Sequence, residues 1–416
     1  MAVSNRSVPE IDLLRIPRRH GLGRLLDRIK WLPGIARIRR IGRKRFLARI
    51  KSQDRRLLIE GVLRHPPGQE FQSALEAWAR KSTPLISSGE PYPRAEISSR
   101  RCSVIINTVD RAKDLAVTLE ALRKHWDQSR DELIIVLGPT GDDSEEVISR
   151  SSMPCRLIHC PDRNLAVSRN LGWQAANGQY VAFIDDDASP ADGWLDSLLE
   201  PLERDLKVGI SAGFVMDGDG ERFLNRYVVG DHLGRAFWFE DSAAATGKVE
   251  ELGTHRAFIT ATGCNMAFRR SALDEIGGFD PFYAYFLEET DAVLRAISAG
   301  FRCVVAPESR VFHRLGANLA RKPDLEIRNR IVVIRSQIHY IGKFGKATFP
   351  ADEIKNCLWE RALLDLEKIA WDCGPNDSCG DLQRRYLQAV ANEFRLDSSP
   401  ESASFPAPPP NKTNAL

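Results

Sequence analysis

The stretch Tyr180-Val-Ala-Phe-Ile-Asp-Asp-Asp187 sets five hydrophobic residues directly before three consecutive carboxylates. A short uninterrupted apolar run predicts a buried strand, and the acidic run then follows at the end of that strand. Neighbouring like charges destabilise one another unless a cation or a solvated turn relieves them. Asp185 and Asp187 can reach the same side of an extended chain, and hard divalent ions prefer such oxygen ligands. The alternative is a simple turn, in which Asp187 and its neighbours cap a helix over residues 190–199.

Further apolar runs and helical spacings surround this strand. The order strand, helix, strand, strand, helix, strand predicts an α/β fold with a mostly parallel central sheet flanked by helices. The runs predicted as strands are residues 102–109, 133–137 and 156–159, and those predicted as helices are residues 114–126 and 164–177. Because ligands of open α/β sheets bind beyond the carboxyl ends of the strands, three loops are candidate binding loops: 108–111, 138–144 and 185–188.

Composition supports a folded protein with an uneven distribution of charge. The chain has 416 residues, 43% of them hydrophobic, and a net charge of +3. Residues 15–56 hold sixteen Lys or Arg and two acids, which leaves 43 basic and 54 acidic residues elsewhere. This basic arm also carries Trp31 and Phe46, so we expect an amphipathic helix that contacts an anionic membrane surface. A solvated charged face, or contact with the acidic body, is the alternative. Nucleic-acid binding is not expected, because no recognised binding module accompanies the basic residues.

The sequence also suggests a compartment. No run approaches the ~18 to 20 apolar residues that cross a bilayer, and the N-terminus lacks a signal-peptide pattern. The eight cysteines form no CxxC pair, which favours reduced thiols. We therefore expect a cytoplasmic protein, peripheral on the inner face of the cell membrane if the arm binds there.

Five separated segments, in order, resemble family 2 glycosyltransferases of the GT-A (Rossmann-like) fold. Together they cover about residues 101–315. The matching segments are Asn164-Leu-Ala-Val-Ser-Arg-Asn-Leu-Gly172 with Ala176-Asn-Gly178, Val181-Ala-Phe-Ile-Asp-Asp-Asp187, Thr262-Gly-Cys-Asn-Met-Ala-Phe-Arg-Arg270 with Ile276-Gly-Gly-Phe-Asp280, Glu288-Glu-Thr-Asp291, and Gly300-Phe301 with Pro307-Glu-Ser-Arg-Val-Phe-His313.

This organisation predicts five regions. The catalytic body occupies residues 101–345, and four other segments flank it: a basic amphipathic arm at 1–60, a linker or helical segment at 61–100, a C-terminal helical extension at 346–397 and a disordered, Pro- and Ser-rich tail at 398–416.

The resemblance assigns metal and acid–base roles. Asp185 and Asp187 correspond to the ends of the DxD motif, with Asp187 as the direct metal ligand and Asp185 nearer the ribose or the ion. Asp186 orients the turn beside the substrate. His313 completes the metal or diphosphate site, unless it is a structural histidine. Glu289 is the general base and Glu288 its neighbour, although both could instead be ordinary acids at a helix N-terminus.

The resemblance also assigns nucleotide and substrate contacts. Thr108, Asp110 and Arg111 follow the first strand, where the family contacts base and ribose. Arg169 is placed near the base or the phosphates, with a helix-surface salt bridge as the alternative, and Asn265 lies in the loop on the acceptor side. The family's Asp after the second strand is missing, since the chain reads Leu137-Gly138-Pro139 there. Asp142 or Asp143 is predicted to replace it.

The predicted function is transfer of a sugar from a UDP-, GDP- or dTDP-sugar to a hydroxyl acceptor, with inversion. The acceptor is expected to be a glycan or polysaccharide precursor, saccharide or lipid-linked, and the cofactor Mn²⁺ or Mg²⁺. Two alternatives stay open: another metal-dependent nucleotide transferase, such as a nucleotidyltransferase, or a non-catalytic protein that binds sugar nucleotides.

Overall fold

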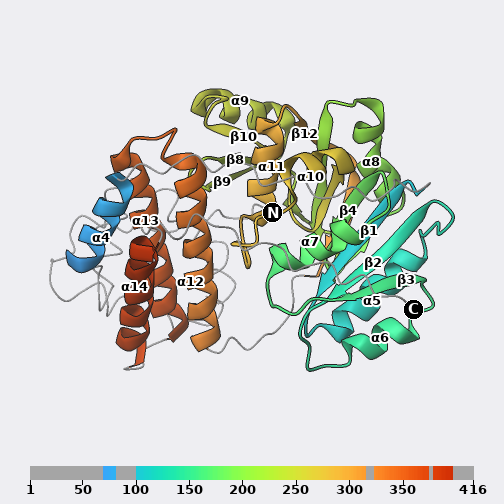
Figure 1. Ribbon diagram of the computed structural model, residues 1–416, viewed down its shortest axis with the longest axis horizontal. Coiled ribbons are helices and arrows are strands. Elements are labelled where there is room, and N and C mark those ends of the chain that lie inside the picture. The colour runs from blue at the N-terminus through green and yellow to red at the C-terminus, as the bar shows by residue number, and fades with distance from the viewer. Residues whose placement is uncertain (1–68, 81–99, 315–322, 374–377, 397–416) are drawn as a thin grey trace, which may run out of the picture.

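The computed structural model describes residues 69–80, 100–314, 323–373 and 378–396. The predicted basic arm and the predicted tail lie outside the described residues. Figure 1 shows an α/β body on the right and a group of helices on the left. None of the described helices combines the length and the apolar character needed to cross a membrane.

Within the described residues, a nine-stranded sheet forms the centre of the body. Its order is β3-β2-β1-β4-β11-β6-β12-β5, with β7 beside β6. The strands are β1 (Cys102–Thr108), β2 (Asp131–Leu137), β3 (Cys155–His159), β4 (Tyr180–Ile184), β5 (Ala188–Pro190), β6 (Val208–Asp217), β7 (Phe223–Asn225), β11 (Asn265–Arg269) and β12 (Arg302–His313).

The predicted α/β architecture is confirmed. Strands β3, β2, β1 and β4 are mutually parallel, as expected, and β12 is parallel to β6. The sheet is mixed at β11, which runs antiparallel between β4 and β6. Parallel neighbours β1 and β2 end together at Thr108 and Leu137, so the loops that follow them meet at one edge of the sheet.

Two local predictions were wrong. A helix, α6 (Ser144–Arg150), lies between β2 and β3, where no helix was expected. The helix predicted over residues 190–199 is α8 (Trp194–Arg204), and β5 precedes it. Gly193, in the left-handed region at φ 67°, occupies the N-cap of α8. The acidic run therefore forms a turn, in which Ala188 N donates to the Asp185 carbonyl at 3.1 Å, but it does not cap that helix.

Alternating side chains of the strands fill two cores, one on each face of the sheet. On one face, Val104 and Ile106 pack with α5 (Ala112–Arg123), α6 and α8. On the other, Ile105 and Phe183 pack with α7 (Leu165–Ala175), α10 (Arg270–Ile276) and α11 (Glu288–Ser298). This alternation is the two-residue period of a strand covered on both faces. The helix predicted from Glu289 to Gly300 is thus α11.

A small antiparallel sheet and a helical bundle complete the described structure. The sheet has the order β10 (Ala257–Thr260), β8 (Tyr227–Asp231), β9 (Ala236–Phe239), and α9 (Ser242–Leu252) packs against it. The bundle has a single core shared by α4 (Gln69–Arg80), α12 (Pro323–Tyr340), α13 (Ala351–Cys373) and α14 (Ser378–Leu396). A five-residue π-helix, η2 (Ile341–Gly345), follows α12. Helices from both ends of the chain therefore meet in one core.

Two helical glycines predict opposite effects of the same substitution. A Cβ at Gly172 would lie 2.7 Å from Cγ2 of the buried Ile105, whereas a Cβ at Gly247 would meet nothing within 4 Å. We expect Gly172→Ala to lower the free energy of unfolding by about 1–3 kcal/mol through overpacking. Gly247→Ala is expected to raise it by roughly 0.5–1 kcal/mol, because alanine favours the helix. Urea denaturation measures both, and a stabilised Gly172→Ala protein would contradict the packing of α7 on β1.

Candidate active site

The acidic run and His313 meet at the edge of the sheet. β4 ends at Ile184, directly before Asp185, and β12 ends at His313. Antiparallel pairing of β12 with β5 sets His313 opposite Ala188. Nε2 of His313 consequently lies 2.8 Å from Oδ1 of Asp187 and 3.8 Å from Oδ2 of Asp185. One ligand atom from each of the three residues fits within 4.8 Å of the others.

This donor set suits a hard divalent cation. Two carboxylates and one imidazole supply oxygen and nitrogen ligands, as Mg²⁺ and Mn²⁺ sites do. Three protein ligands from one side leave coordination positions for phosphate oxygens and water, which is how Mg²⁺ is commonly held with phosphate substrates. The residues predicted as metal ligands are thus brought together.

Arg111 supplies positive charge next to the same carboxylates. Its Nε lies 3.0 Å from Oδ1 of Asp186, and its Nη2 lies 2.5 Å from Oδ2 of Asp187. Burial alone would raise the pKa of Asp187, but the hydrogen bond and charge of His313, together with Arg111, hold it below its usual value. For Asp186, burial prevails and raises the pKa to about 7. The pKa values of these two consecutive acids are therefore shifted in opposite directions.

The second acidic group stands at the start of α11. Phe286 and Leu287 both adopt left-handed backbone angles, at φ 76° and 70°, and Glu288 and Glu289 follow. Glu288 is buried, and its Oε1 lies 3.6 Å from Nη2 of Arg169. Its other carboxylate oxygen, Oε2, is buried without a hydrogen-bond partner.

Glu289 is less buried than Glu288 and has a raised pKa. Burial of the carboxyl group and the negative charge of Glu288 raise it, while Arg169 opposes the shift. A carboxylate with a raised pKa is suited to accept a proton near neutral pH. The two glutamates therefore differ: Glu288 is buried and held by Arg169, whereas Glu289 is suited to exchange a proton.

Arg169 lies against the acid pair formed by Glu288 and Glu289. The residue is 2% exposed, which rules out the surface salt bridge considered as the alternative. Its guanidinium donates to the Gly263 carbonyl at 3.3 Å and lies 5.0 Å from the Phe183 ring centroid. A Cβ at Gly263 would come within 2.7 Å of Nη2 of Arg169, so a larger residue here would displace the guanidinium. The charge of Arg169 also acts on Asp185, so the arginine stands between the two acidic groups.

The loops after β1 and β2 are tied to each other by their own carboxylates. Asp110, in the left-handed region at φ 55°, accepts from Gly141 N at 2.7 Å and from the Thr140 hydroxyl at 3.1 Å, and it also pairs with Arg163. Asp142 accepts from Ala112 N at 2.8 Å, across the loops. Although burial opposes it, this bond and those from the Ser144 and Thr140 hydroxyls lower the pKa of Asp142 to about 2.

Asp142 is therefore a structural cap and does not take the place of the missing base-binding aspartate. Its oxygens are occupied by the first residues of α5 and α6, Ala112 and Ser144. Asp143 occupies the N-cap position of α6 without a side-chain cap bond. Thr108 is buried at the end of β1, beside this loop pair.

Asn265 is a buried scaffold residue, which corrects its predicted contact with substrate. It is fully buried, and its Oδ1 accepts from Trp194 Nε1 at 2.8 Å. Its Nδ2 donates to the carbonyls of Phe214 at 3.0 Å and Ser309 at 3.3 Å. The side chain therefore joins α8, β6, β11 and β12 and has no free group to offer a ligand.

Two residues that the motifs did not single out belong to this region. Arg314 donates its backbone N–H to the Asp187 carbonyl at 2.9 Å, and its guanidinium donates to the Thr118 hydroxyl at 2.8 Å. Its position next to His313 was the signal available in the sequence. Tyr285 is 58% exposed, and burial of its hydroxyl together with the charges of Glu288, Glu289, Asp185 and Asp187 raises its pKa. No sequence pattern marks Tyr285.

Part of the chain is similar in sequence to known glycosyltransferases. Residues 103–277 match the family model "Glycosyl transferase family 2". Chondroitin synthase of Escherichia coli is 31% identical over 137 residues, which are 32% of this chain and 19% of that protein. N-acetylglucosaminyl-diphospho-decaprenol L-rhamnosyltransferase of Mycobacterium tuberculosis is 27% identical over 153 residues, 35% of this chain and 50% of the relative. The chain thus spans half or less of the length of these relatives.

One similar solved structure is the mannosyltransferase PcManGT of Pyrobaculum calidifontis in complex with GDP-Man and Mn²⁺. The alignment covers 79% of this chain and 94% of that chain, with a TM-score of 0.45 and 14% sequence identity. The family match contains the acidic run and Arg169 but ends before α11 and His313, whose roles stay predictions. Residues 103–277, somewhat less than half of the chain, are thus similar to glycosyl transferase family 2.

Proposed function

We propose that the protein transfers a sugar from a nucleoside-diphosphate sugar to a hydroxyl group of a saccharide or lipid-linked acceptor, with inversion. The observation that carries the proposal is the arrangement of two different acidic groups about Arg169. Asp185 and Asp187 meet His313 within 4.8 Å, and Glu288 and Glu289 stand at the start of α11. A transferase needs both groups, because its leaving group is an anion and its nucleophile must lose a proton.

Asp185, Asp187 and His313 would hold a divalent cation, Mn²⁺ or Mg²⁺. When bound, such an ion neutralises the charge that develops on the departing diphosphate. Arg111, ion-paired with Asp186 and Asp187, places a further positive charge next to the diphosphate position. Asp110 and Arg163 bind each other beside the β1 and β2 loops, where we place the nucleoside.

Glu289 acts as the general base in this proposal. Its carboxylate takes the proton of the acceptor hydroxyl while that oxygen forms a bond to the anomeric carbon. The bond from the anomeric carbon to the diphosphate oxygen breaks, and its electron pair leaves with the nucleoside diphosphate. Glu288, paired with Arg169 at 3.6 Å, fixes the first turn of α11 and keeps the pKa of Glu289 raised.

The acceptor class is supported by the names of relatives and by the predicted arm. One relative is named for N-acetylglucosaminyl-diphospho-decaprenol and another for glucosyl-dolichyl phosphate, both lipid-linked sugars. A basic amphipathic arm at residues 15–56 would bring the active site to such an acceptor at the inner membrane face. The paired acids Glu288 and Glu289 favour transfer to a hydroxyl over nucleotidyl transfer, which has no need of a base at that place.

The metal role of Asp187 predicts a loss of cation-dependent binding. Asp187→Asn should weaken Mn²⁺-dependent binding of the preferred nucleoside diphosphate by roughly 10- to 100-fold, the range seen when metal sites are disturbed. Isothermal titration against UDP, GDP and dTDP, with and without Mn²⁺, measures this. Asp192→Asn is the matched control, because its side chain is 97% exposed nearby. Binding that needs no cation in the wild-type protein would contradict the metal site.

The base role of Glu289 predicts a loss of turnover without a loss of binding. Glu289→Gln should lower kcat by about 10²- to 10⁴-fold, the contribution typical of a general base. Donor affinity, measured by titration, should stay within about twofold, since the side chain does not belong to the cation site. Glu308→Gln, on a side chain that is 78% exposed, is the control. Unchanged turnover in Glu289→Gln would remove Glu289 from this role.

The coupling of the two glutamates predicts a shift in the pH profile. Glu289 must be ionised to act, so kcat should rise with pH through its raised pKa. Glu288→Gln removes the neighbouring negative charge that raises this pKa, so the acidic limb of the kcat profile should move to lower pH. Stopped assays at saturating donor and Mn²⁺ separate the shift from changes in binding. An acidic limb that stays in place, or moves upward, would show that another group controls the rate.

A further inference from the structure

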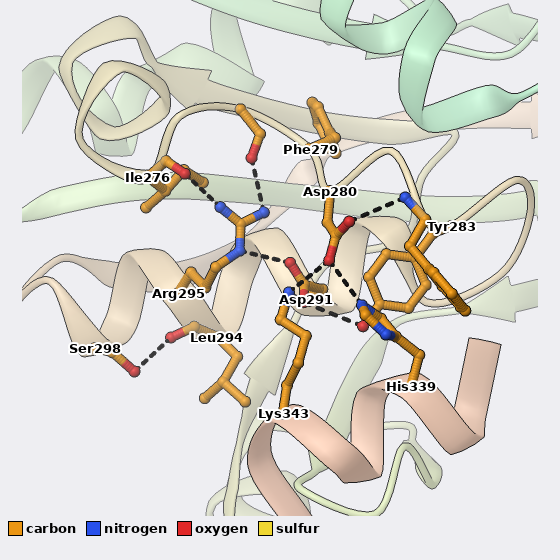
Figure 2. A network of polar contacts seen from close by, with 12 residues as sticks. Ile276, Phe279, Asp280, Tyr283, Asp291, Leu294, Arg295, Ser298, His339 and Lys343 are labelled. Atoms are coloured by element: carbon orange, nitrogen blue, oxygen red, sulfur yellow. Dashed lines mark hydrogen bonds and ion pairs between the residues drawn. The ribbon is translucent and has the colours of Figure 1, made fainter. Parts of the chain in front are cut away.

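A buried network of charges connects the helical bundle to the segment that carries the acid pair. Figure 2 shows His339 and Lys343, from α12 and η2, pointing toward Asp280 and Asp291. Nζ of Lys343 lies 2.8 Å from Oδ2 of Asp280 and also pairs with Asp291. Asp280 and Asp291 are respectively 3% and 0% exposed at their side chains, and Lys343 is 8% exposed. One ammonium group is thus shared by two buried carboxylates.

The remaining partners of the two carboxylates are fixed as well. Nε2 of His339 lies 2.9 Å from Oδ2 of Asp280. Although burial opposes it, this contact and the charge of Lys343 hold the pKa of Asp280 well below its usual range. Asp291 accepts from Arg295 Nε at 2.5 Å and from the Tyr283 hydroxyl at 3.2 Å. Arg295 also donates to the carbonyls of Ile276 and Gly278, so α11 is joined to the turn before it.

The segment between Asp280 and Asp291 needs such support. Phe286 and Leu287 are non-glycine residues in the left-handed region, a conformation that persists only where surrounding contacts hold it. Leu287 occupies the N-cap of α11 and gives no side-chain cap bond. Glu288 and Glu289 follow directly, so their positions depend on this strained pair.

α12 and η2 contact several residues of this segment. Lys343 and His339 hold Asp280, and Lys343 also holds Asp291 beyond the strained pair. The imidazole of His339 stacks on the Phe282 ring at a centroid distance of 3.8 Å. The hydroxyl of Ser336 donates to the Tyr285 carbonyl at 3.0 Å. Lys343 stands in a π-helical turn, a distortion that is frequent at functional sites.

We propose that α12 and η2 brace the acid pair, and that Lys343 is a positioning residue for Glu288 and Glu289. By neutralising Asp280 and Asp291 together, Lys343 holds both ends of residues 280–291 in the strained conformation that starts α11. The catalytic consequence rests on the proposed function, because it takes Glu289 as the base. The brace itself lies beyond residues 103–277 and is a feature of this chain's own C-terminal helices.

Hydrogen exchange and kinetics of Lys343→Met in the full chain test the brace together. Losing the shared ammonium leaves Asp280 with His339 and Asp291 with Arg295 and Tyr283, and nothing then links the two buried carboxylates. Amides of residues 281–291 should therefore exchange at least about tenfold faster, while those of α7 and β4 stay unchanged. Misplacing the base should lower kcat about 10- to 100-fold with donor KM within about twofold. Lys343→Arg, which keeps the charge, should recover much of both. Lys355→Met, at a surface pair with Asp352, is the control and should change neither.

Each outcome decides a different question. Unchanged exchange in residues 281–291, or loosening spread equally over the whole body, would overturn the brace. If the wild-type protein transfers no sugar from UDP-, GDP- or dTDP-sugars while Lys343→Met still loosens residues 281–291 selectively, the proposed function fails and the brace stands. If Lys343→Met does not fold, the double variant Lys343→Met/Asp280→Asn is tested, because it removes one charge of each sign. Recovery of folding then supports the shared pairing, and no recovery overturns it.

Discussion

Buried carboxylates and the cations that neutralise them are the constraint on which this structure depends. An ionised carboxylate removed from water is stable only when a cation or several donors compensate it. Arg111 and His313 compensate Asp187, Arg169 compensates Glu288, and Lys343 compensates Asp280 and Asp291. In each case the two partners come from segments far apart in the chain, so these pairs also fix how the elements fit together.

The same constraint gives chemically identical residues different tasks. Asp186 and Asp187 are neighbours, yet the first has a raised and the second a lowered pKa, because only Asp187 accepts from His313. Glu288 is buried with Arg169, whereas Glu289 is less buried and has a raised pKa. Arg169 lies over the Phe183 ring and beside Gly263. Environment, and not residue type, separates the properties of these neighbouring acids.

The C-terminal helices join this scheme through the strained turn before α11. A site built at the end of a sheet is positioned by strands on one side, but Glu288 and Glu289 lie at a helix start that follows two left-handed residues. Support from the bundle, through Ser336, His339 and Lys343, replaces the support that strands give to Asp185 and Asp187. The bundle core contains α4 as well, so a helix that precedes the body in the chain packs with the helices that follow it.

The sequence by itself determined the elements whose causes are local. A hydrophobic run followed by acids predicts a strand that ends at a cation site, and acids before an amphipathic run predict the start of α11. On those grounds, together with the family resemblance, the sequence predicts Asp185 and Asp187 at the cation site and Glu289 at the helix start. Only the tertiary structure decided that Asp142 caps two helices, that Asn265 is a buried hub and that Arg169 supports Glu288. The partners Ala112, Trp194 and Glu288 are respectively 30, 71 and 119 positions away along the chain. At such separations, the packing of the sheet and helices decides which side chains meet, and the neighbouring residues in the sequence do not.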